Sequence, residues 1–331
     1  MKTAVLGTGS WATGLSQVLC DNGHTVLMYG VDKDEIEDVN LRHRNSRYFP
    51  GVEIHKGIRA TADIGLALQG AQMVVIAVPT KAVKQVALKA LPYMEQNAVV
   101  VNASKGFDPE TNDRMSETLR KIFAERPDIK TASVIGPSHA EEVIQRQLTA
   151  VCAVSSDAEV AERVQALLSN SYIRLYVCTD EIGAEYGVAI KNIIAIASGI
   201  LVGRGYGDNA KAALITRGLA EMVRFGCKKG AKRETFFGLT GVGDLVVTCF
   251  SRHSRNYQAG LEIGRANGAG EFLRENKKTV EGINSCKVIH DELQYCDFEM
   301  PLVQSIYEIL FEGRLPSEAI KELMERALKP E

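Results

Sequence analysis

The sequence feature that most restricts the fold is a glycine-containing turn between an apolar strand and a helix at the start of the chain. Residues 2–6 form a short apolar run, residues 7–12 have the sequence GTGSWA, and a helical pattern continues to about residue 22 before a second apolar run at 25–29. This order of strand, turn, helix and strand is the context in which the G-x-G-x-x-G/A pattern binds a dinucleotide. The sequence therefore predicts a parallel βαβ unit that binds a dinucleotide; the alternative is a plain βα turn.

Three small residues give this turn its expected properties. Gly7 permits the tight turn, Gly9 lets the backbone approach a pyrophosphate, and Ala12 allows the helix to pack closely on the strand. The helix N-terminus adds unpaired N–H groups and the positive end of the helix dipole.

Asp32 lies 20 residues after Ala12, where an acidic side chain can bind the ribose 2′-hydroxyl of NAD. The next residue, Lys33, could instead face the 2′-phosphate of NADP. A solvated acid at the start of a helix over residues 34–41 is an equal alternative for Asp32. The choice between NAD and NADP therefore stays open.

Short apolar strands continue to alternate with helices as far as residue 178. The expected strands are 72–78, 98–102, 132–135, 150–154 and 173–177, and the expected helices are 81–91, 112–125 and 158–168. This alternation predicts a doubly wound, mainly parallel sheet with helices on both faces, a Rossmann-type α/β domain. Lys105 and Ser138 follow two of these strands in glycine-containing turns, and ligands bind outside the carboxyl ends of such strands.

The pattern changes after Thr179, and only helices are expected from there on. They cover residues 181–202, 209–228, 234–237, 256–266, 282–294, 302–311 and 316–328. The predicted organisation is a dinucleotide-binding domain at 1–180 and an all-α substrate-binding and catalytic domain at 181–331.

The first of these helices contains a lysine within an almost continuous apolar run. Residues 188–202 are nearly all apolar or small, apart from Lys191 and Asn192, so the helix should be buried on nearly all faces. A buried ammonium group needs partners, and an active site in a cleft between the domains would supply them. The alternative is a snorkelling lysine at the edge of the helix.

Two stretches of the helical half are expected to be loops with chemical roles. Residues 238–245 are rich in glycine, so Asp244 could point into a cleft, or could be a capping or loop acid. Ser254 is a plausible N-cap of the following helix. Arg255 beside that helix N-terminus suits a phosphate group, although a solvated surface arginine is the simpler alternative.

Composition excludes several classes of function. The formal net charge of −2 shows no basic excess, which argues against nucleic acid or an anionic membrane as the main partner. The seven scattered cysteines form no C-x-x-C pair, and no spacing of histidines or cysteines suggests a metal site. We expect free thiols, no bound metal, no signal peptide, no membrane-spanning segment and a cytoplasmic location.

Together these motifs closely resemble those of the glycerol-3-phosphate dehydrogenases, in particular the bacterial NAD(P)-dependent type. The matching stretches, in family order over nearly the whole chain, are GTGSWATGL (7–15), ASKGF (103–107), IGPSHAEE (135–142), AIKNIIAIASGI (189–200), NAKAALITRGLAEM (209–222), LTGVGDLVVTC (239–249), HSRNYQAG (253–260) and VEGINS (280–285). The resemblance implies a dinucleotide domain followed by a helical domain.

The resemblance also implies roles for individual residues. Lys191 corresponds to the general acid/base at the C2 oxygen of the substrate. The implied substrate-binding residues are Lys105, Gly136, Ser138, Asn192, Asp244, Ser254, Arg255 and Asn256. The implied cofactor contacts are Ser10, Trp11, Lys105, Ala140, Arg255, Thr279 and Glu281, in addition to Gly7, Gly9, Ala12 and Asp32 from the turn.

Three positions depart from the family pattern. Ala12 and Gly14 replace the usual glycine and alanine of the turn, an exchange of small residues that should keep the fold. Val31 stands where many members have a basic residue after the second strand, which weakens the case for recognition of a 2′-phosphate.

The reaction implied is the reversible reduction of dihydroxyacetone phosphate to sn-glycerol 3-phosphate with NAD or NADP, supplying glycerol phosphate for phospholipid synthesis, in a homodimeric enzyme. One rival is another two-domain Rossmann dehydrogenase of the 3-hydroxyacid or ketopantoate reductase type, although the Ser254-Arg255-Asn256 segment favours a phosphorylated substrate. The other is a dinucleotide-sensing protein without catalysis, which need not retain Lys191.

Overall fold

The computed structural model describes residues 1–328 of the chain. It divides into two compact units, Met1–Glu181 and Ile182–Glu331, which are described separately below. The predicted helical domain extends to residue 331, and its last three residues lie outside the described part. The boundary between residues 180 and 181 stays a prediction about domains.

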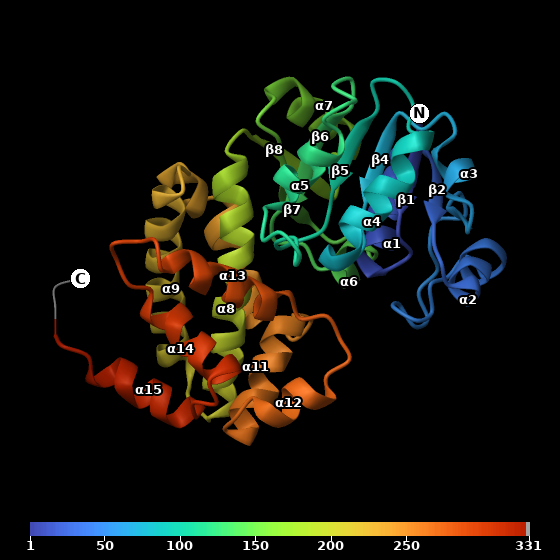
Figure 1. Ribbon diagram of the computed structural model, residues 1–331. Helices are drawn as coiled ribbons and strands as arrows, with labels where there is room; N and C mark the ends of the chain where they lie inside the picture. Colours follow the sequence, from blue (N-terminus) through green and yellow to red (C-terminus); the bar gives the residue numbers. More distant parts are fainter. Residues whose placement is uncertain (329–331) are drawn as a thin grey trace. The chain divides into compact units, whose positions relative to one another are not determined.

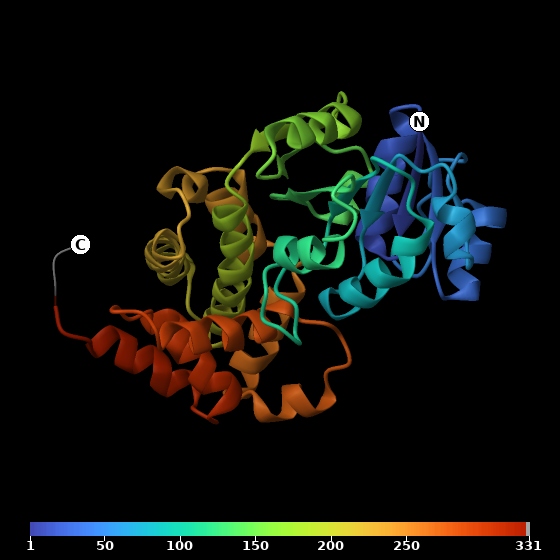
Figure 2. The same ribbon diagram turned by 45° about the horizontal axis from the view of Figure 1, so that its top comes forward.

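The first unit is built on one sheet of eight strands, with helices on both faces (Figures 1 and 2). The strands are β1 (Lys2–Leu6), β2 (Thr25–Tyr29), β3 (Arg59–Thr61), β4 (Met73–Ile76), β5 (Val99–Asn102), β6 (Lys130–Ile135), β7 (Thr149–Val154) and β8 (Ile173–Cys178). Their order is β3-β2-β1-β4-β5-β6-β7-β8. All neighbours are parallel except β6 and β7, which are antiparallel. The predicted Rossmann-type, mainly parallel α/β domain is confirmed.

Successive residues of the central strands point to opposite faces, so each strand contributes to two cores. On β1, Val5 belongs to the core shared with α1 (Ser10–Asp21) and α7 (Ala158–Leu168). Ala4 and Leu6 belong to the core on the other face, which includes α3 (Ile64–Leu68), α4 (Thr80–Ala90) and α5 (Met115–Ile122). Burial on both faces explains why these strands are continuously apolar in the sequence.

The second unit contains helices and, within the described residues, no strand. They are α8 (Glu181–Gly203), α9 (Asp208–Lys228), a 3₁₀ turn (Arg233–Phe237), a π turn (Leu239–Gly243), α10 (Asp244–Phe250), α11 (Arg255–Ala266), α12 (Gly270–Glu275), α13 (Glu281–Leu293), α14 (Pro301–Phe311) and α15 (Pro316–Glu325). The predicted all-α second half is therefore confirmed for the described residues.

Helix α8 is the centre of this unit's core. Every residue from 183 to 200 is buried, as the apolar run predicts. By length and composition it is the one helix of the described residues that could cross a membrane, with a mean hydropathy of 1.6, but 83% of its apolar window is buried inside the protein.

Helices α8 and α11 cross at backbone contact because glycines face each other. A Cβ atom on Gly260 would lie 2.0 Å from the Ile196 carbonyl oxygen, and one on Gly199 would lie 2.1 Å from the Tyr257 oxygen. One turn further on, Gly264 meets Ile200 in the same way, at 2.5 Å. This crossing fixes the N-terminus of α11 against the middle of α8.

Several predicted elements differ from the observed ones. The helix expected at 34–41 is a short α2 (Lys33–Glu37) followed by a π turn (Asp38–Arg42). The loop expected at 238–245 is wrong, because the π turn and α10 make it helical. The predictions also lack β3, α3, α6 (Ala140–Val143) and α12, which are short elements of three to six residues.

Candidate functional site

The turn after β1 has the backbone that its glycines predict. Gly7 has a φ of 126°, which a residue with a side chain rarely adopts, and an added Cβ would lie 2.5 Å from the Ala77 carbonyl oxygen. Gly9, the N-cap of α1, has open space where its side chain would be. A ligand can therefore approach the backbone at Gly9.

The first turn of α1 offers polar groups to such a ligand. The N–H groups of Ser10, Trp11 and Ala12 belong to the first helical turn, which has no intrahelical acceptors for them. The indole Nε1 of Trp11 is buried and has no hydrogen-bond partner among the described residues. A dinucleotide fits this turn. Its phosphate oxygens can accept hydrogen bonds from the N–H groups of the first turn, and another acceptor on the dinucleotide can bind the indole N–H.

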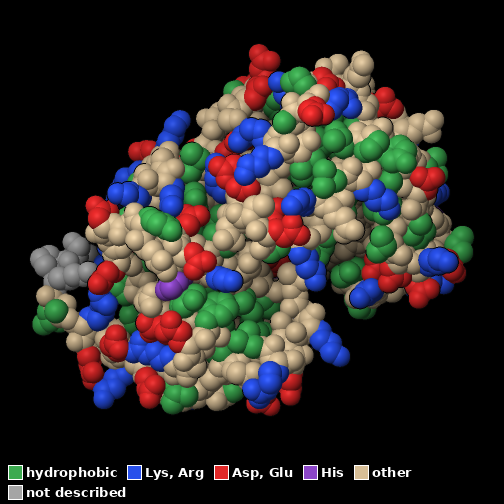
Figure 3. All heavy atoms as spheres, in the orientation of Figure 1, with side chains coloured by type: hydrophobic (Ala, Val, Ile, Leu, Met, Phe, Trp, Pro, Cys, Tyr) green, Lys and Arg blue, Asp and Glu red, His purple; other side chains and the backbone are tan. Residues whose placement is uncertain are grey.

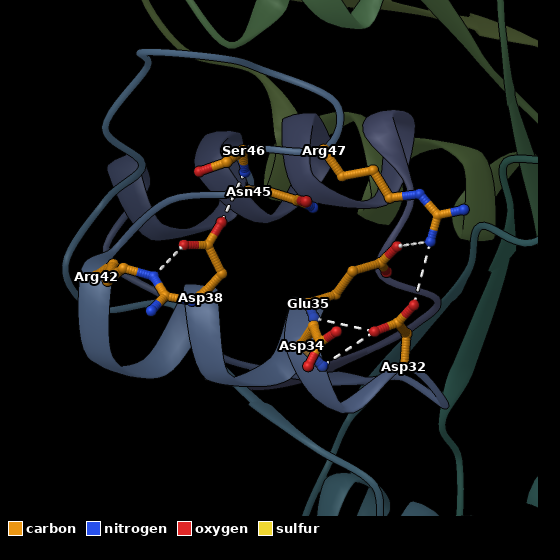
Figure 4. A pocket seen from close by; sticks show the side chains of 8 residues that line it. All are labelled: Asp32, Asp34, Glu35, Asp38, Arg42, Asn45, Ser46 and Arg47. Atoms are coloured by element: carbon orange, nitrogen blue, oxygen red, sulfur yellow. Dashed lines mark hydrogen bonds and ion pairs between the residues drawn. The ribbon is translucent and has the colours of Figure 1, made fainter.

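The carboxylate of Asp32 faces both the helix that follows it and an arginine (Figure 4). Its Oδ1 accepts hydrogen bonds from the N–H groups of Asp34 and Glu35, at 3.0 and 3.2 Å. Its Oδ2 lies 3.1 Å from Arg47 Nη1, which also lies 2.9 Å from Glu35 Oε1. Asp32 thus caps α2, as the alternative interpretation expected, and its side chain is 38% exposed.

Lys105, Gly136 and Ser138 come together at the carboxyl ends of β5 and β6. Lys105 Nζ donates to the Gly136 carbonyl oxygen at 3.0 Å, and Ser138 Oγ donates to the same oxygen at 3.0 Å. Gly136 has a φ of 150°, and a Cβ there would lie 2.9 Å from Val151 Cα on the antiparallel strand β7. Ala140 begins α6 immediately afterwards and is buried.

Lys191 places its side-chain nitrogen in the interior of the second unit. It is 3% exposed, and its Nζ lies 2.7 Å from Asp244 Oδ1, a carboxylate on a residue that is 1% exposed. Nζ also donates to Thr248 Oγ1 at 2.8 Å, and that hydroxyl donates to the Asp244 carbonyl oxygen at 2.6 Å. The snorkelling alternative is wrong, because the ammonium group is buried and paired.

The residue after Lys191 is joined to α11 and α13. Asn256 Nδ2 donates to Asn192 Oδ1 at 3.0 Å, and its own Oδ1 accepts from the Gly282 N–H at 2.9 Å. Ser254 caps α11, as predicted, by accepting from the Tyr257 N–H at 3.2 Å. Three helices are therefore linked through two buried amide side chains.

Arg255 is the exposed member of this group and pairs with the half-buried Glu281. Arg255 Nη2 lies 3.2 Å from Glu281 Oε1, at the first residue of α13, and the arginine side chain remains 54% exposed. Thr279, two residues before Glu281, is half-buried in the segment leading into that helix. An exposed guanidinium at a helix N-terminus can bind a phosphate group.

The predicted residues thus form small groups in contact: Lys105 and Ser138 on Gly136 in the first unit, and Lys191 with Asp244 and Asn192 with Asn256 in the second. Thr248 and Arg47 were missed by the sequence reasoning. Thr248 follows Asp244 by four residues, a helical spacing, but the sequence predicts a loop at 238–245 and no element over residues 246–250. No group of three or more His, Cys, Asp or Glu side chains within residues 1–328 could hold a metal ion.

Two family models together match most of the chain. The model described as the NAD-dependent glycerol-3-phosphate dehydrogenase N-terminus matches residues 2–161, and the one described as its C-terminus matches residues 180–321. The chain belongs to the NAD-dependent glycerol-3-phosphate dehydrogenase family. The resemblance drawn from the motifs is confirmed.

Individual members of the glycerol-3-phosphate dehydrogenase family agree over the full length. The chain is 47% identical over 327 residues to glycerol-3-phosphate dehydrogenase [NAD(P)+] of Bacillus velezensis, covering 98% of this chain and 94% of that protein. It matches the crystal structure of glycerol-3-phosphate dehydrogenase from Coxiella burnetii with a TM-score of 0.90 and 34% identity, covering 98% of both chains. A ketopantoate reductase from Ralstonia eutropha shares only the fold, with a TM-score of 0.59 and 15% identity over 97% of this chain and 100% of that chain.

Proposed function

We propose that this protein catalyses the reversible reduction of dihydroxyacetone phosphate to sn-glycerol 3-phosphate with a nicotinamide cofactor, and so supplies glycerol phosphate for phospholipid synthesis. Membership of the family supports this reaction. One observation supports the assignment of Lys191 as the catalytic residue. Its side-chain nitrogen is buried in the core helix α8, where it contacts Asp244 and Thr248 of α10.

Lys191 serves as the general acid/base. When bound, the reduced nicotinamide supplies the hydride that adds to C2 of the ketone. Negative charge then develops on the C2 oxygen, and Lys191 Nζ stabilises it and donates a proton to give the alcohol. In the reverse direction the neutral amine accepts the hydroxyl proton. Asp244 and Thr248 fix the position of Nζ, and Asp244 compensates its charge.

Arg255 binds the substrate phosphate. Its exposed guanidinium lies at the start of α11, where backbone N–H groups add to the positive potential. The buried amides of Asn192 and Asn256 orient the hydroxyl groups of the substrate. Ser254 caps the N-terminus of α11. Lys105, Gly136 and Ser138 contribute further substrate contacts from the first unit.

The dinucleotide binds at residues 1–180, and residues 181–331 supply the catalytic group. The open backbone at Gly9, the first turn of α1 and the Trp11 indole support this assignment. Ala140, Thr279 and Glu281 are further cofactor contacts in the proposal, and Asp32 faces the ribose.

The test follows NADH or NADPH absorbance at 340 nm with dihydroxyacetone phosphate, for the wild type and for Lys191→Met. We expect rapid oxidation by the wild type, and loss of turnover by about a hundredfold or more in the variant. Cofactor affinity, measured separately by tryptophan fluorescence, should be unchanged. Methionine fills a similar volume and so leaves no cavity, and circular dichroism checks that the variant, which loses the ion pair with Asp244, is folded.

The outcomes separate the substrate from the mechanism. No turnover by the wild type would contradict the substrate assignment, and 2-oxo acids such as ketopantoate would be tried next. Near-normal turnover in Lys191→Met would contradict the acid/base role but leave the reaction standing. Dinucleotide binding without turnover of any ketone would favour a sensing protein.

We further propose a cytoplasmic homodimer that neither binds nucleic acid nor inserts into membranes. On the face shown in Figure 3, lysine and arginine side chains alternate with aspartate and glutamate, which supports the absence of a nucleic-acid surface. Sedimentation analysis tests the dimer, and cell fractionation tests the location.

A further inference from the structure

A buried asparagine outside the glycine turn contacts that turn from the protein side. Asn45 lies in the loop between the π turn Asp38–Arg42 and β3, and it is 0% exposed. Its Nδ2 donates to the Thr8 carbonyl oxygen at 2.7 Å and to Thr13 Oγ1 at 2.8 Å. The reaction described above gives this residue no role.

The hydroxyl of Thr13 extends this contact to the next carbonyl of the turn. Thr13 is 0% exposed, and its Oγ1 donates to the Gly9 carbonyl oxygen at 3.0 Å. The Thr13 N–H donates to the same oxygen, also at 3.0 Å. Asn45 therefore holds the Thr8 carbonyl directly and supports the Gly9 carbonyl through Thr13.

The direction of these carbonyls decides the direction of the N–H groups that follow them. The described residues contain no cis peptide bond, and in a planar trans peptide the C=O and N–H groups point in opposite directions. Because the Thr8 carbonyl points toward Asn45, the Gly9 N–H points away from it. No protein atom lies within 4 Å of the place where a Gly9 side chain would be, so a phosphate group can approach this peptide.

The loop that carries Asn45 is held in place by contacts of its own. The ends of the loop meet where the Ile54 N–H donates to the His43 carbonyl oxygen at 2.9 Å, and Phe49 between them is 3% exposed in the core of the first unit. The N–H of Ser46, the residue after Asn45, donates to Asp38 Oδ2 at 2.7 Å (Figure 4). Asn45 is thus a fixed point against which the turn can be oriented.

The amide of Asn45 is an unfavourable way to fill this space. Its Oδ1 is buried and has no hydrogen-bond partner among the described residues. A buried acceptor without a partner opposes folding, so the two bonds made by Nδ2 are gained at the expense of stability. Such a compromise is expected where a side chain serves a ligand site rather than the core.

From these contacts we propose that Asn45 is a positioning residue, which orients the peptide between Thr8 and Gly9 so that the Gly9 N–H meets the pyrophosphate of the cofactor. Asn45 itself does not touch the cofactor. The proposal rests on the dinucleotide binding in the proposed function and adds to it a residue from outside the turn. Loss of the Asn45 amide weakens cofactor binding and leaves the chemistry at Lys191 unchanged.

The kinetics of Asn45→Ala test this role in the full-length protein. The assay uses dihydroxyacetone phosphate and whichever of NADH and NADPH the wild type oxidises faster. We expect the KM for the cofactor to rise about tenfold, with kcat and the KM for dihydroxyacetone phosphate within about twofold of the wild type. The chain has one tryptophan, Trp11 in the first turn of α1, so its fluorescence measures the dissociation constant of the cofactor, which should rise by the same factor.

Two further variants separate this role from a general loss of stability. Asn40, in the π turn before the loop, donates to the Ala60 carbonyl oxygen at 2.8 Å and accepts from the Ala60 N–H at 2.9 Å. Asn40→Ala therefore also removes two hydrogen bonds from the first unit, but it should leave the KM for the cofactor within about twofold of the wild type. Thr13→Val removes the hydroxyl between Asn45 and the Gly9 carbonyl and should raise that KM about threefold.

The outcomes distinguish this proposal from the proposed function. Unchanged cofactor affinity in a folded Asn45→Ala variant, or an equal loss of affinity in Asn40→Ala, overturns the role of Asn45 and leaves the reaction intact. If Asn45→Ala does not fold, unchanged affinity in Thr13→Val overturns it instead. Failure of the wild type to bind either dinucleotide overturns both proposals. Binding without turnover of dihydroxyacetone phosphate contradicts the substrate, and the dissociation constants of the variants then decide the role of Asn45.

Discussion

Lys191 and Asp244 are two charges taken out of water together. Each is nearly inaccessible to solvent, so the removal of one partner takes a countercharge at 2.7 Å away from the other charge in the core. Such a pair contributes little net stability compared with an apolar pair of equal volume, but it depends strongly on both members being present.

A double-mutant cycle measures this dependence. Lys191→Met and Asp244→Leu should each lower the free energy of unfolding by about 3–5 kcal/mol in urea, and the double variant should cost less than the sum. The exposed pair of Lys84 and Glu110, at 2.7 Å, is the control and should show a coupling of about 1 kcal/mol or less. Additive effects at Lys191 and Asp244 would contradict the ion pair.

Glu221 on α9 is a buried acid whose ionisation should affect stability. It is 4% exposed, and burial raises its pKa to about 7, although its carboxylate accepts from the N–H groups of Leu302 and Val303 at the start of α14. The folded protein therefore binds more protons than the unfolded chain between about pH 4.5 and pH 7.

Stability should accordingly fall as the pH rises through this window. One pKa unit corresponds to about 1.4 kcal/mol, so Glu221 alone should remove about 3 kcal/mol of unfolding free energy between pH 4.5 and pH 7. Urea titrations at pH 5 and pH 7.5 should show a flatter pH dependence in Glu221→Gln than in the wild type. The exposed Glu162→Gln serves as the control, and equal slopes in all three proteins would refute the assignment.

At the scale of elements, the glycines of α8 and α11 decide how closely two helices approach. Intrinsic propensity favours alanine over glycine in a helix interior by about 1 kcal/mol, so it predicts that Gly260→Ala stabilises the protein. The crossing predicts the opposite, because the added Cβ would lie 2.0 Å from a backbone oxygen that cannot move alone.

We expect the crossing to dominate. Gly260→Ala should lower the free energy of unfolding by about 2 kcal/mol or more, measured by thermal and urea denaturation. Gly268→Ala has nothing within 4 Å of the added Cβ and should change stability by less than about 0.5 kcal/mol. A stabilised Gly260→Ala variant would show that the helices can separate at little cost.

The sequence predicted long elements better than short ones. The strand–turn–helix of residues 2–21 and the buried helix α8 have strong periodicity, whereas β3 has three residues and carries no pattern of its own. The sequence DLVVTCF of α10 contains three consecutive residues of strand type, Val246, Val247 and Thr248, within a helix. Tertiary packing therefore makes this segment helical against its intrinsic preference, and the helix places Thr248 in contact with Lys191.

At the scale of the whole molecule, the reactivity of the cysteine thiols measures how well the cores of the two units exclude solvent. Burial raises the pKa of Cys20 to about 11 and those of Cys152 and Cys249 to about 12, so few of these groups are thiolates at neutral pH. Cys286 is also buried with a raised pKa, and Cys227 is exposed.

A thiol reagent should therefore modify the native protein selectively. At pH 7.5 we expect Cys227 to react within minutes, and the four buried cysteines to react at least about a hundredfold more slowly. Peptide mass spectrometry identifies the modified positions, and all seven should react in urea. Rapid labelling of Cys249 in the native protein would contradict the packing of α10 against α8.

The candidate residues could be predicted because the glycine turn and the family motifs are local in sequence. Their partners were harder to predict, since Arg47 and Glu281 are 15 and 26 residues away from Asp32 and Arg255. Such contacts depend on how loops return to the ends of strands and helices, which periodicity does not describe.

The facing glycines also limit how this gene can be recombined. Gly199 and Gly203 on α8 lie against α11, whose own Gly260 and Gly264 lie against α8. A chimera whose crossover point falls between residues 204 and 254 takes α8 from one parent and α11 from the other. If either parent has a larger residue at one of these four glycine positions, that side chain meets the backbone of the other parent's helix. A chimera should therefore take both helices from the same parent.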